Sequence, residues 1–371
     1  MESHISPGPL GLYVHIPFCL TRCPYCAFFS LPFSRERFEH YLKILNQEKE
    51  LYRSMIDRPL RSVYFGGGTP SLMSASQINA ILQDMPFEDD AEISLEINPI
   101  QVNPQYITEL KSTPINRLSL GIQSLNDEDL KWLQRRHKAA DIAPRIKLLR
   151  DGGFSNISLD YIYGLPNSSL ESVRTTLEQM IELEPDHLSS YLLEIYDDSP
   201  IVKFRNQIPQ DEVLADQYEM ICSMLEAAGL RQYEVSNFAR EGCQSKHNLL
   251  YWKRNDYLAW GAGASGYFQG QKYQNPADLE LYEEGVLAHR IFPGAIENTL
   301  EDDEWDYTMM RLRLIEGLNF AEYRMRYGRD FGREQAIRKL ADSGVLIADT
   351  KGIRISPKGL FISNYIISEL L

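Results

Sequence analysis

The chain has 371 residues, of which 43% are hydrophobic and 24% charged, a composition typical of an ordinary folded protein rather than a disordered or fibrous one. Its formal net charge of -14 argues against nucleic acid as a partner, because DNA- and RNA-binding proteins usually present a positive field to the phosphates. The sequence contains no apolar run of about 18 residues, and its start, MESHISPGPLGLYVHI, lacks a basic segment followed by an apolar one. We therefore expect a cytoplasmic protein without a membrane span or a leader.

Six short runs rich in β-branched and aromatic residues predict β-strands along the first half of the chain. Between them, apolar residues recur at helical spacing, as in residues 38–52 after a candidate cap at Ser34 and in residues 170–181. Parallel strands need crossovers of this length, so residues 1–200 are predicted to form an α/β fold, a partial (β/α)6 barrel with its chemistry in the loops after the strands. The six runs start at Gly11, Arg61, Glu92, Arg117, Asn156 and His187.

The second half of the chain has a different pattern. A helix is predicted from Asp211, followed by a glycine- and aromatic-rich segment, and we treat residues 201–300 as an extension of the barrel. The acidic run EDDE at residues 301–304 is interpreted as a boundary. Residues 301–371 then read as helices followed by a short hairpin turning at Lys351 and Gly352, a pattern that predicts a winged-helix-like domain.

Three of the five cysteines, Cys19, Cys23 and Cys26, lie directly after the first predicted strand. This spacing lets one loop supply three thiolates to an iron-sulfur cluster and leaves one iron without a protein ligand. A zinc site is the alternative, although structural zinc usually takes four ligands in two pairs and the chain has no second pair. Cys222 and Cys243 lie far from this loop and are expected to be reduced, small buried residues.

Polar residues gather after the other predicted strands. The motif GGGTP at residues 66–70 follows the second strand, and its glycines let backbone N–H groups approach a small polar ligand. A cofactor that chelates an open iron, such as S-adenosylmethionine, needs backbone donors, a carboxylate, an amide and a guanidinium. We expect these groups to form a ring above one mouth of the barrel: Glu96 and Gln123 at two strand ends, Asp160 within the fifth strand, and Arg135 on a following helix.

The motifs YVHIPFCLTRCPYC, GGGTP, SLEINP, LGIQS and LDYIYGLP, in this order, resemble the radical S-adenosylmethionine superfamily and its HemN/HemW group over essentially the whole chain. The resemblance implies a [4Fe-4S] cluster on Cys19, Cys23 and Cys26, with the amine and carboxylate of S-adenosylmethionine on the free iron. It also implies roles for further residues around the cofactor: Tyr13 and Tyr25 beside the cluster and cofactor, Gly67, Gly68 and Thr69 at the methionyl end, Glu96 at the ammonium, Arg135 at the carboxylate, and Gln123 and Asp160 at the ribose hydroxyls.

Within this group, HNLLYW at residues 247–252 matches the HNxxYW motif of the haem-chaperone branch. The match implies a protein that binds haem and delivers it to recipient haemoproteins, with His247 as a candidate haem ligand. Cys243 is the other candidate ligand, and a hydrogen-bonded core histidine is the structural alternative for His247.

The alternative function is that of the other branch, oxygen-independent coproporphyrinogen III oxidase, which carries out oxidative decarboxylation. That branch typically has a further cysteine where this chain has Phe28, and a longer N-terminal extension. Whether the protein is an enzyme is left open by the sequence. The resemblance further implies an electron donor such as a flavodoxin or ferredoxin, and we expect peripheral contact with the inner face of a membrane.

Overall fold

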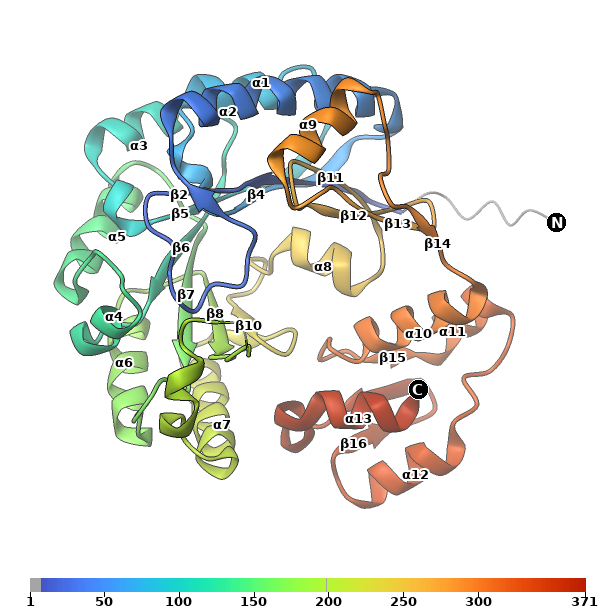
Figure 1. Ribbon diagram of the computed structural model, residues 1–371. Coiled ribbons are helices and arrows are strands. Elements are labelled where there is room, and N and C mark those ends of the chain that lie inside the picture. Colours follow the sequence, from blue (N-terminus) through green and yellow to red (C-terminus); the bar gives the residue numbers. More distant parts are fainter. Residues whose placement is uncertain (1–7, 198) are drawn as a thin grey trace.

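The computed structural model describes residues 8–197 and 199–371 (Figure 1). Residues 1–7, on which the expectation of no leader partly rests, lie outside this range. The described residues form one twelve-stranded sheet, in the order β14-β13-β12-β11-β1-β4-β5-β6-β7-β8-β10-β9, and a separate three-stranded sheet near the C-terminus.

The six strands expected from the sequence form a run of parallel neighbours, which confirms the partial barrel. Figure 1 shows the helices that follow them lying along the outer, convex side of the curved sheet. The strands are β1 (Leu10–Ile16), β4 (Leu60–Gly67), β5 (Phe87–Ile97), β6 (Arg117–Gln123), β7 (Ile157–Tyr163) and β8 (His187–Leu192). The helices are α1 (Arg35–Tyr52), α2 (Ala75–Leu82), α3 (Pro104–Leu110), α4 (Asp127–Trp132), α5 (Ile142–Asp151) and α6 (Leu170–Glu182).

Side chains along these strands alternate between two very different surroundings. On β4, Val63 and Phe65 are fully buried in the hydrophobic core that the sheet forms with the helices. The residues that alternate with them, Ser62 and Tyr64, face the concave side, where Ser62 bonds to His247 and Tyr64 donates to Glu96. Because alternate residues of a strand point to opposite faces, one face supplies the core and the other supplies a polar barrel interior.

Residues 201–300 add strands to both edges of this sheet instead of forming a layer of their own. After α7 (Asp211–Ala227), the strands β10 (Asn237–Ala239) and β9 (Arg231–Gln232) continue the sheet beyond β8 in antiparallel order. At the other edge, β11 (Asp256–Trp260) pairs parallel with β1, and three antiparallel strands follow it. These strands are β12 (Ser265–Phe268), β13 (Gln271–Gln274) and β14 (Ile296–Glu297), while α8 (Lys246–Trp252) lies inside the curve and α9 (Leu279–Leu287) packs on α1 (Figure 1).

The C-terminal residues combine helices with a small antiparallel sheet, as the winged-helix-like prediction required. The sheet has the order β15-β17-β16 and the hairpin between β16 and β17 turns at Lys351. The acidic run at residues 301–304, interpreted as a boundary, lies in the first turns of α10, where carboxylates are favoured by the helix dipole. The elements are α10 (Leu300–Arg311), β15 (Leu318–Asn319), α11 (Phe320–Tyr327), α12 (Glu334–Asp342), β16 (Leu346–Ala348), β17 (Gly352–Ile355) and α13 (Ser363–Leu370).

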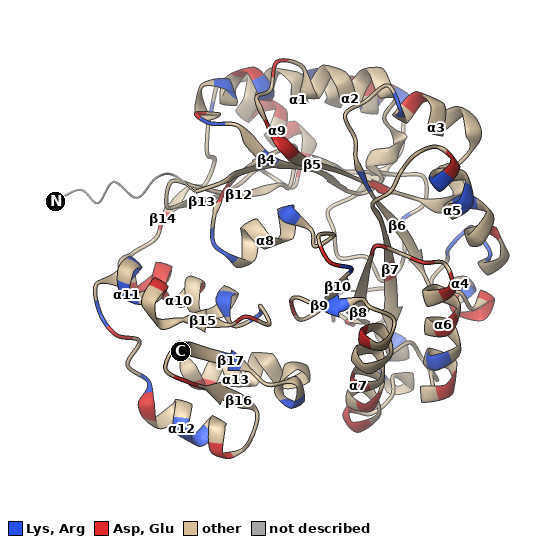
Figure 2. Ribbon diagram, turned by 180° about the vertical axis from the view of Figure 1, so that it is seen from behind, with Lys and Arg blue, Asp and Glu red and all other residues tan. Residues whose placement is uncertain are grey.

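Charged residues are distributed mainly over the helices and connecting loops, as Figure 2 shows from behind. Among the described helices, none combines the length and the apolar character needed to cross a bilayer.

One buried carboxylate joins the barrel to the extension. Glu48 on α1 is 1% exposed and accepts hydrogen bonds from Gly261 N (2.7 Å), Asn275 Nδ2 (2.7 Å) and the Tyr282 hydroxyl (2.6 Å). Burial raises the pKa of Glu48 to about 7, against the lowering effect of these three donors. The extension is therefore held to α1 by a polar contact inside an apolar core, where unpaired donors would be costly.

We expect Glu48→Ala to lower the free energy of unfolding by about 3 kcal/mol or more, because three buried donors lose their acceptor. The folded protein favours protonated Glu48, so this group's contribution to stability is full below its unfolded pKa and is lost as the pH rises through about 7. Glu48→Gln should remove this pH dependence. Its free energy of unfolding should therefore increase relative to that of the unmodified protein as the pH rises from 5 to 8. Denaturant titrations measure both effects, with Glu50→Ala on the exposed side of α1 as the control; equal losses for Glu48→Ala and Glu50→Ala would contradict the prediction.

Candidate functional site

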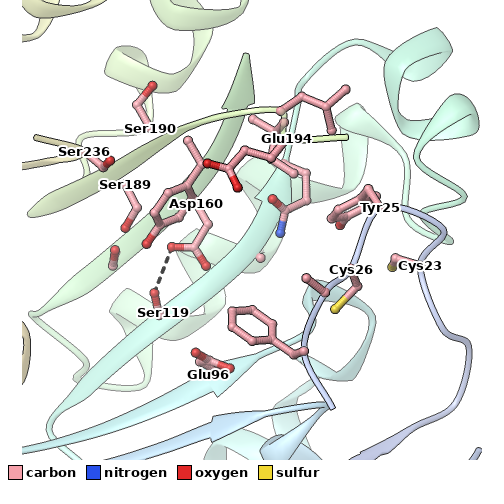
Figure 3. Close-up of a pocket in the computed structure, with 18 of the residues that line it drawn as sticks. Cys23, Tyr25, Cys26, Glu96, Ser119, Asp160, Ser189, Ser190, Glu194 and Ser236 are labelled. Carbon is pink, nitrogen blue, oxygen red and sulfur yellow. Dashed lines mark hydrogen bonds between the residues drawn. The ribbon is translucent and has the colours of Figure 1, made fainter. Parts of the chain in front are cut away.

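A cavity of about 620 Å³ opens at the C-terminal ends of the parallel strands. Its wall combines the cysteine loop, the ends of the barrel strands, and residues from the C-terminal domain. Figure 3 shows Cys23, Tyr25 and Cys26 on one side of this cavity and Ser189, Ser190 and Ser236 on the other. This is the position at which barrels of parallel strands carry their chemistry.

The cysteine loop is closed at its base by a short parallel pair, β2 (Phe18–Cys19) with β3 (Leu31–Pro32). Cys19, Cys23 and Cys26 are all free and half-buried, and all three line the cavity. The Thr69 hydroxyl donates to Cys19 Sγ at 3.6 Å, and Arg135 Nη1 donates to Cys23 Sγ at 3.4 Å. Burial raises the pKa of Cys19 and of Cys26.

The donor set fits a multi-iron cluster. Thiolates are the preferred protein ligands of iron-sulfur clusters, in which each cysteine holds a different iron. A single zinc ion instead needs its ligands converged about 2 Å from one point. Among the described residues, no three His, Cys, Asp or Glu side chains are arranged to hold one ion in this way.

The glycines of GGGTP bring the end of β4 against the cysteine loop. Gly67 has a positive φ of 112°, and a Cβ there would lie 2.7 Å from the His15 ring. A Cβ on Gly68 would lie 2.8 Å from the Phe18 carbonyl and 3.0 Å from Cys19 Sγ. A side chain at either position would push the strand end away from the thiols, so glycine is required for packing as well as for access to a ligand.

Two carboxylates line the floor of the cavity. Glu96 accepts hydrogen bonds from the Tyr64 hydroxyl (3.0 Å) and from Gly67 N (3.2 Å), and Asp160 accepts one from Ser119 (3.0 Å; Figure 3). Burial, and secondarily the nearby Asp160, raises the pKa of Glu96 to about 8. Burial also raises the pKa of Asp160 to about 6. A cationic or hydrogen-bond-donating ligand would favour the ionised form of both groups.

The amide of Gln123 and the guanidinium of Arg135 also line the cavity, but the prediction that Arg135 lies on a helix is wrong. Gln123 ends β6 with a positive φ of 67°. Arg135 does not lie on a helix; it follows α4, which ends at Trp132. Its Nη2 donates to the Gly121 carbonyl at 2.5 Å, whereas its buried Nε has no partner among the described residues. An unpaired buried guanidinium nitrogen is what a carboxylate-bearing ligand would satisfy.

Tyr25 lines the cavity, but Tyr13 and His247 lie outside its wall. The Tyr13 hydroxyl bonds to His15 Nδ1 at 2.9 Å, and its ring lies 6.4 Å from that of His247. His247 is 1% exposed, with Nδ1 bonded to the Ser62 hydroxyl (2.8 Å) and Nε2 to the Tyr251 hydroxyl (2.7 Å). Burial lowers the pKa of His247 to about 3, so the ring is neutral at pH 7. Tyr13 and His247 thus belong to a layer of residues beneath the cavity.

The two remaining cysteines are half-buried. The Cys222 thiol donates to Gln232 Oε1 at 3.6 Å, and the Cys243 carbonyl accepts from Arg117. Neither lines the cavity.

Sequence reasoning missed several inward-facing residues. The Arg117 side chain is 2% exposed, lies 4.0 Å from a Glu92 carboxylate oxygen, and lines the cavity together with Ser119 and His187. All of these stand at the inward positions of predicted strands, so their alternation with core residues was the available signal. Alternation indicates which face of the sheet a residue occupies, but it does not predict that the sheet curves and turns this face into the wall of a cavity.

Comparisons with known proteins agree with this geometry. Residues 13–180 match the family model of the radical SAM superfamily, and residues 308–362 match that of the HemN C-terminal domain. The chain is 31% identical to the heme chaperone HemW of Bacillus subtilis over 97% of this chain and 98% of that protein. It is 40% identical to HemW of Haemophilus influenzae over 70% of each chain.

Among solved structures, coproporphyrinogen III oxidase (HemN) from Escherichia coli superposes with a TM-score of 0.84, at 24% identity, covering 98% of this chain and 90% of that one. This likeness establishes the fold, a radical SAM barrel with a C-terminal domain. Several bacterial relatives with near-complete coverage carry the HemW name, so the haem-chaperone branch is supported over the oxidase branch. The chain belongs to the radical SAM superfamily and, within it, to the HemW family.

Proposed function

We propose that this protein is a haem chaperone that holds a [4Fe-4S] cluster, binds S-adenosylmethionine and haem, and passes haem to recipient haemoproteins. The observation that carries the proposal is the near-full-length similarity to proteins named heme chaperone HemW, in a chain whose cavity combines three thiols with a ring of polar groups.

In this proposal, Cys19, Cys23 and Cys26 hold the cluster. Its open iron and S-adenosylmethionine together supply reductive cleavage of the sulfonium carbon-sulfur bond. The chain's own groups bind and orient the cofactor: Gly67, Gly68 and Thr69 at the methionyl end, Glu96 at the amine, Arg135 at the carboxylate, Gln123 and Asp160 at the ribose, and Tyr25 beside the cluster, with Tyr13 supporting from beneath.

An electron-transfer protein, such as a flavodoxin or ferredoxin, would supply the electron, and contact with a membrane would be peripheral. Oxidative decarboxylation is the weaker candidate because Phe28, 64% exposed at the cavity wall, stands where the oxidase branch has its additional cysteine.

Anaerobic reconstitution should load the unmodified protein with about four iron and four sulfide per chain. Replacement of Cys23 or Cys26 by Ser should abolish the charge-transfer absorbance of the cluster, because each thiolate holds a separate iron. Cys222→Ser and Cys243→Ser are the matched controls and should load normally. Stoichiometric zinc in place of iron, or loss of the cluster in either control, would refute the assignment.

Binding of S-adenosylmethionine should depend on pH through Glu96. Because burial raises the pKa of Glu96 to about 8, its carboxylate must lose a proton to accept from an amine donor at pH 6 to 8. We therefore expect the affinity of the reconstituted protein to rise with pH by up to about tenfold per unit, and to level off above pH 8. Calorimetric titrations of Glu96→Gln, which cannot ionise, provide the control; the same slope in both proteins would exclude Glu96 as the responsive group.

In this proposal His247 would ligate the haem iron, which would require its hydrogen bond to Tyr251 to open. If His247 ligates, Tyr251→Phe should strengthen the Soret band of added haem or leave it intact, and His247→Ala should remove it. If both variants keep the band but melt at lower temperature, His247 instead holds α8 against β4 through Ser62, and the proposed ligand is wrong.

A further inference from the structure

The far end of the cavity, away from the cysteines, is built partly by the C-terminal domain. Val235 N donates to the Arg313 carbonyl at 3.1 Å, and Glu234 forms an isolated antiparallel bridge with Leu314. Ser190 N donates to the Ser236 carbonyl at 2.8 Å, which links the end of β8 to the same segment. Arg313 is therefore held beside Val235 and Ser236, the side of the cavity that Figure 3 shows opposite Cys23 and Cys26.

Arg313 places a guanidinium group at the far end of the cavity, beside Val235 and Ser236. Its Nη2 donates to Asn364 Oδ1 at 2.9 Å, and its guanidinium carbon lies 5.9 Å from the Trp252 ring centroid. Among the described residues it forms no ion pair, whereas Arg117, another arginine of the wall, lies near Glu92. The neighbouring Glu234 is fully buried and is not part of the cavity wall.

The surface around Arg313 is mixed in character. Leu360 and Phe361 of the C-terminal domain line the cavity together with Val235 and Tyr218, and the rings of Tyr218 and Phe361 lie 6.0 Å apart. Beside them, the Ser190 hydroxyl is buried and has no hydrogen-bond partner among the described residues. An apolar wall with one planar guanidinium and an unsatisfied hydroxyl fits an apolar molecule that carries a carboxylate.

We propose that Arg313 binds a carboxylate of the cargo, whose apolar body lies against Leu360, Phe361 and Val235, so that the C-terminal domain forms part of the cargo site. This inference rests on the proposed function, because haem is an apolar macrocycle with two carboxylate side chains. Trp252 of the HNLLYW segment lies against the same guanidinium, so that segment supports the proposed cargo site through Arg313.

The test compares haem with haem dimethyl ester, in which both carboxylates are blocked, by absorbance titration of the full-length, cluster-loaded protein. We expect the unmodified protein to bind haem about tenfold to a hundredfold more tightly than the ester, the range typical of a charge-assisted hydrogen bond. Arg313→Gln should weaken haem binding by the same factor and leave ester binding unchanged, and Arg313→Lys should restore part of the loss. Arg354→Gln, which removes a half-exposed arginine of the same domain outside the cavity, is the matched control and should behave as the unmodified protein.

Equal affinities for haem and its ester in the unmodified protein would overturn the inference without requiring any variant to fold. An Arg313→Gln protein that still discriminates between the two would overturn it as well. Both results leave haem binding itself in place. If neither compound binds, the proposed function fails and the inference fails with it.

Discussion

The polar concave face of the sheet is the constraint on which the rest of the structure depends. Every second residue of the barrel strands faces inward, and these positions hold serines, carboxylates and an arginine in place of apolar residues. Polar groups removed from water cost free energy unless they are paired. The interior therefore cannot close as a dry core, and the fold must either pair these groups internally or leave them for a ligand.

The extension provides much of the internal pairing. Helix α8 brings His247, which bonds to Tyr251 of the same helix, to Ser62 of β4. The segment after β9 brings Tyr233 to His187 of β8, whose other ring nitrogen bonds to Ser158 of β7. Both are serine-histidine-tyrosine chains of buried, hydrogen-bonded groups. Two buried groups without a hydrogen-bond partner among the described residues belong to the cavity wall: Arg135 Nε near the thiols and the Ser190 hydroxyl at the far end.

The parallel strands could be predicted from the sequence because short runs of β-branched and aromatic residues are separated by segments with helical apolar spacing. The cysteine loop could be placed because it directly follows the first strand. The short strands of the extension could not, since β9 and β14 have two residues each and exist only through pairing with distant segments. Likewise, the sequence places Tyr13 and Tyr25 equally close to the cysteine motif. Only the structure shows that Tyr25 belongs to the cavity wall, whereas Tyr13 lies beneath it and bonds to His15.

The twelve-stranded sheet ends on both sides in one of these two-residue strands, and it never closes on itself. In a sheet that stays open, a long free edge would offer backbone groups to other chains and promote aggregation. Edges this short provide almost no template for another strand. The sheet therefore stays open without presenting the long unpaired edge at which open sheets associate with other chains.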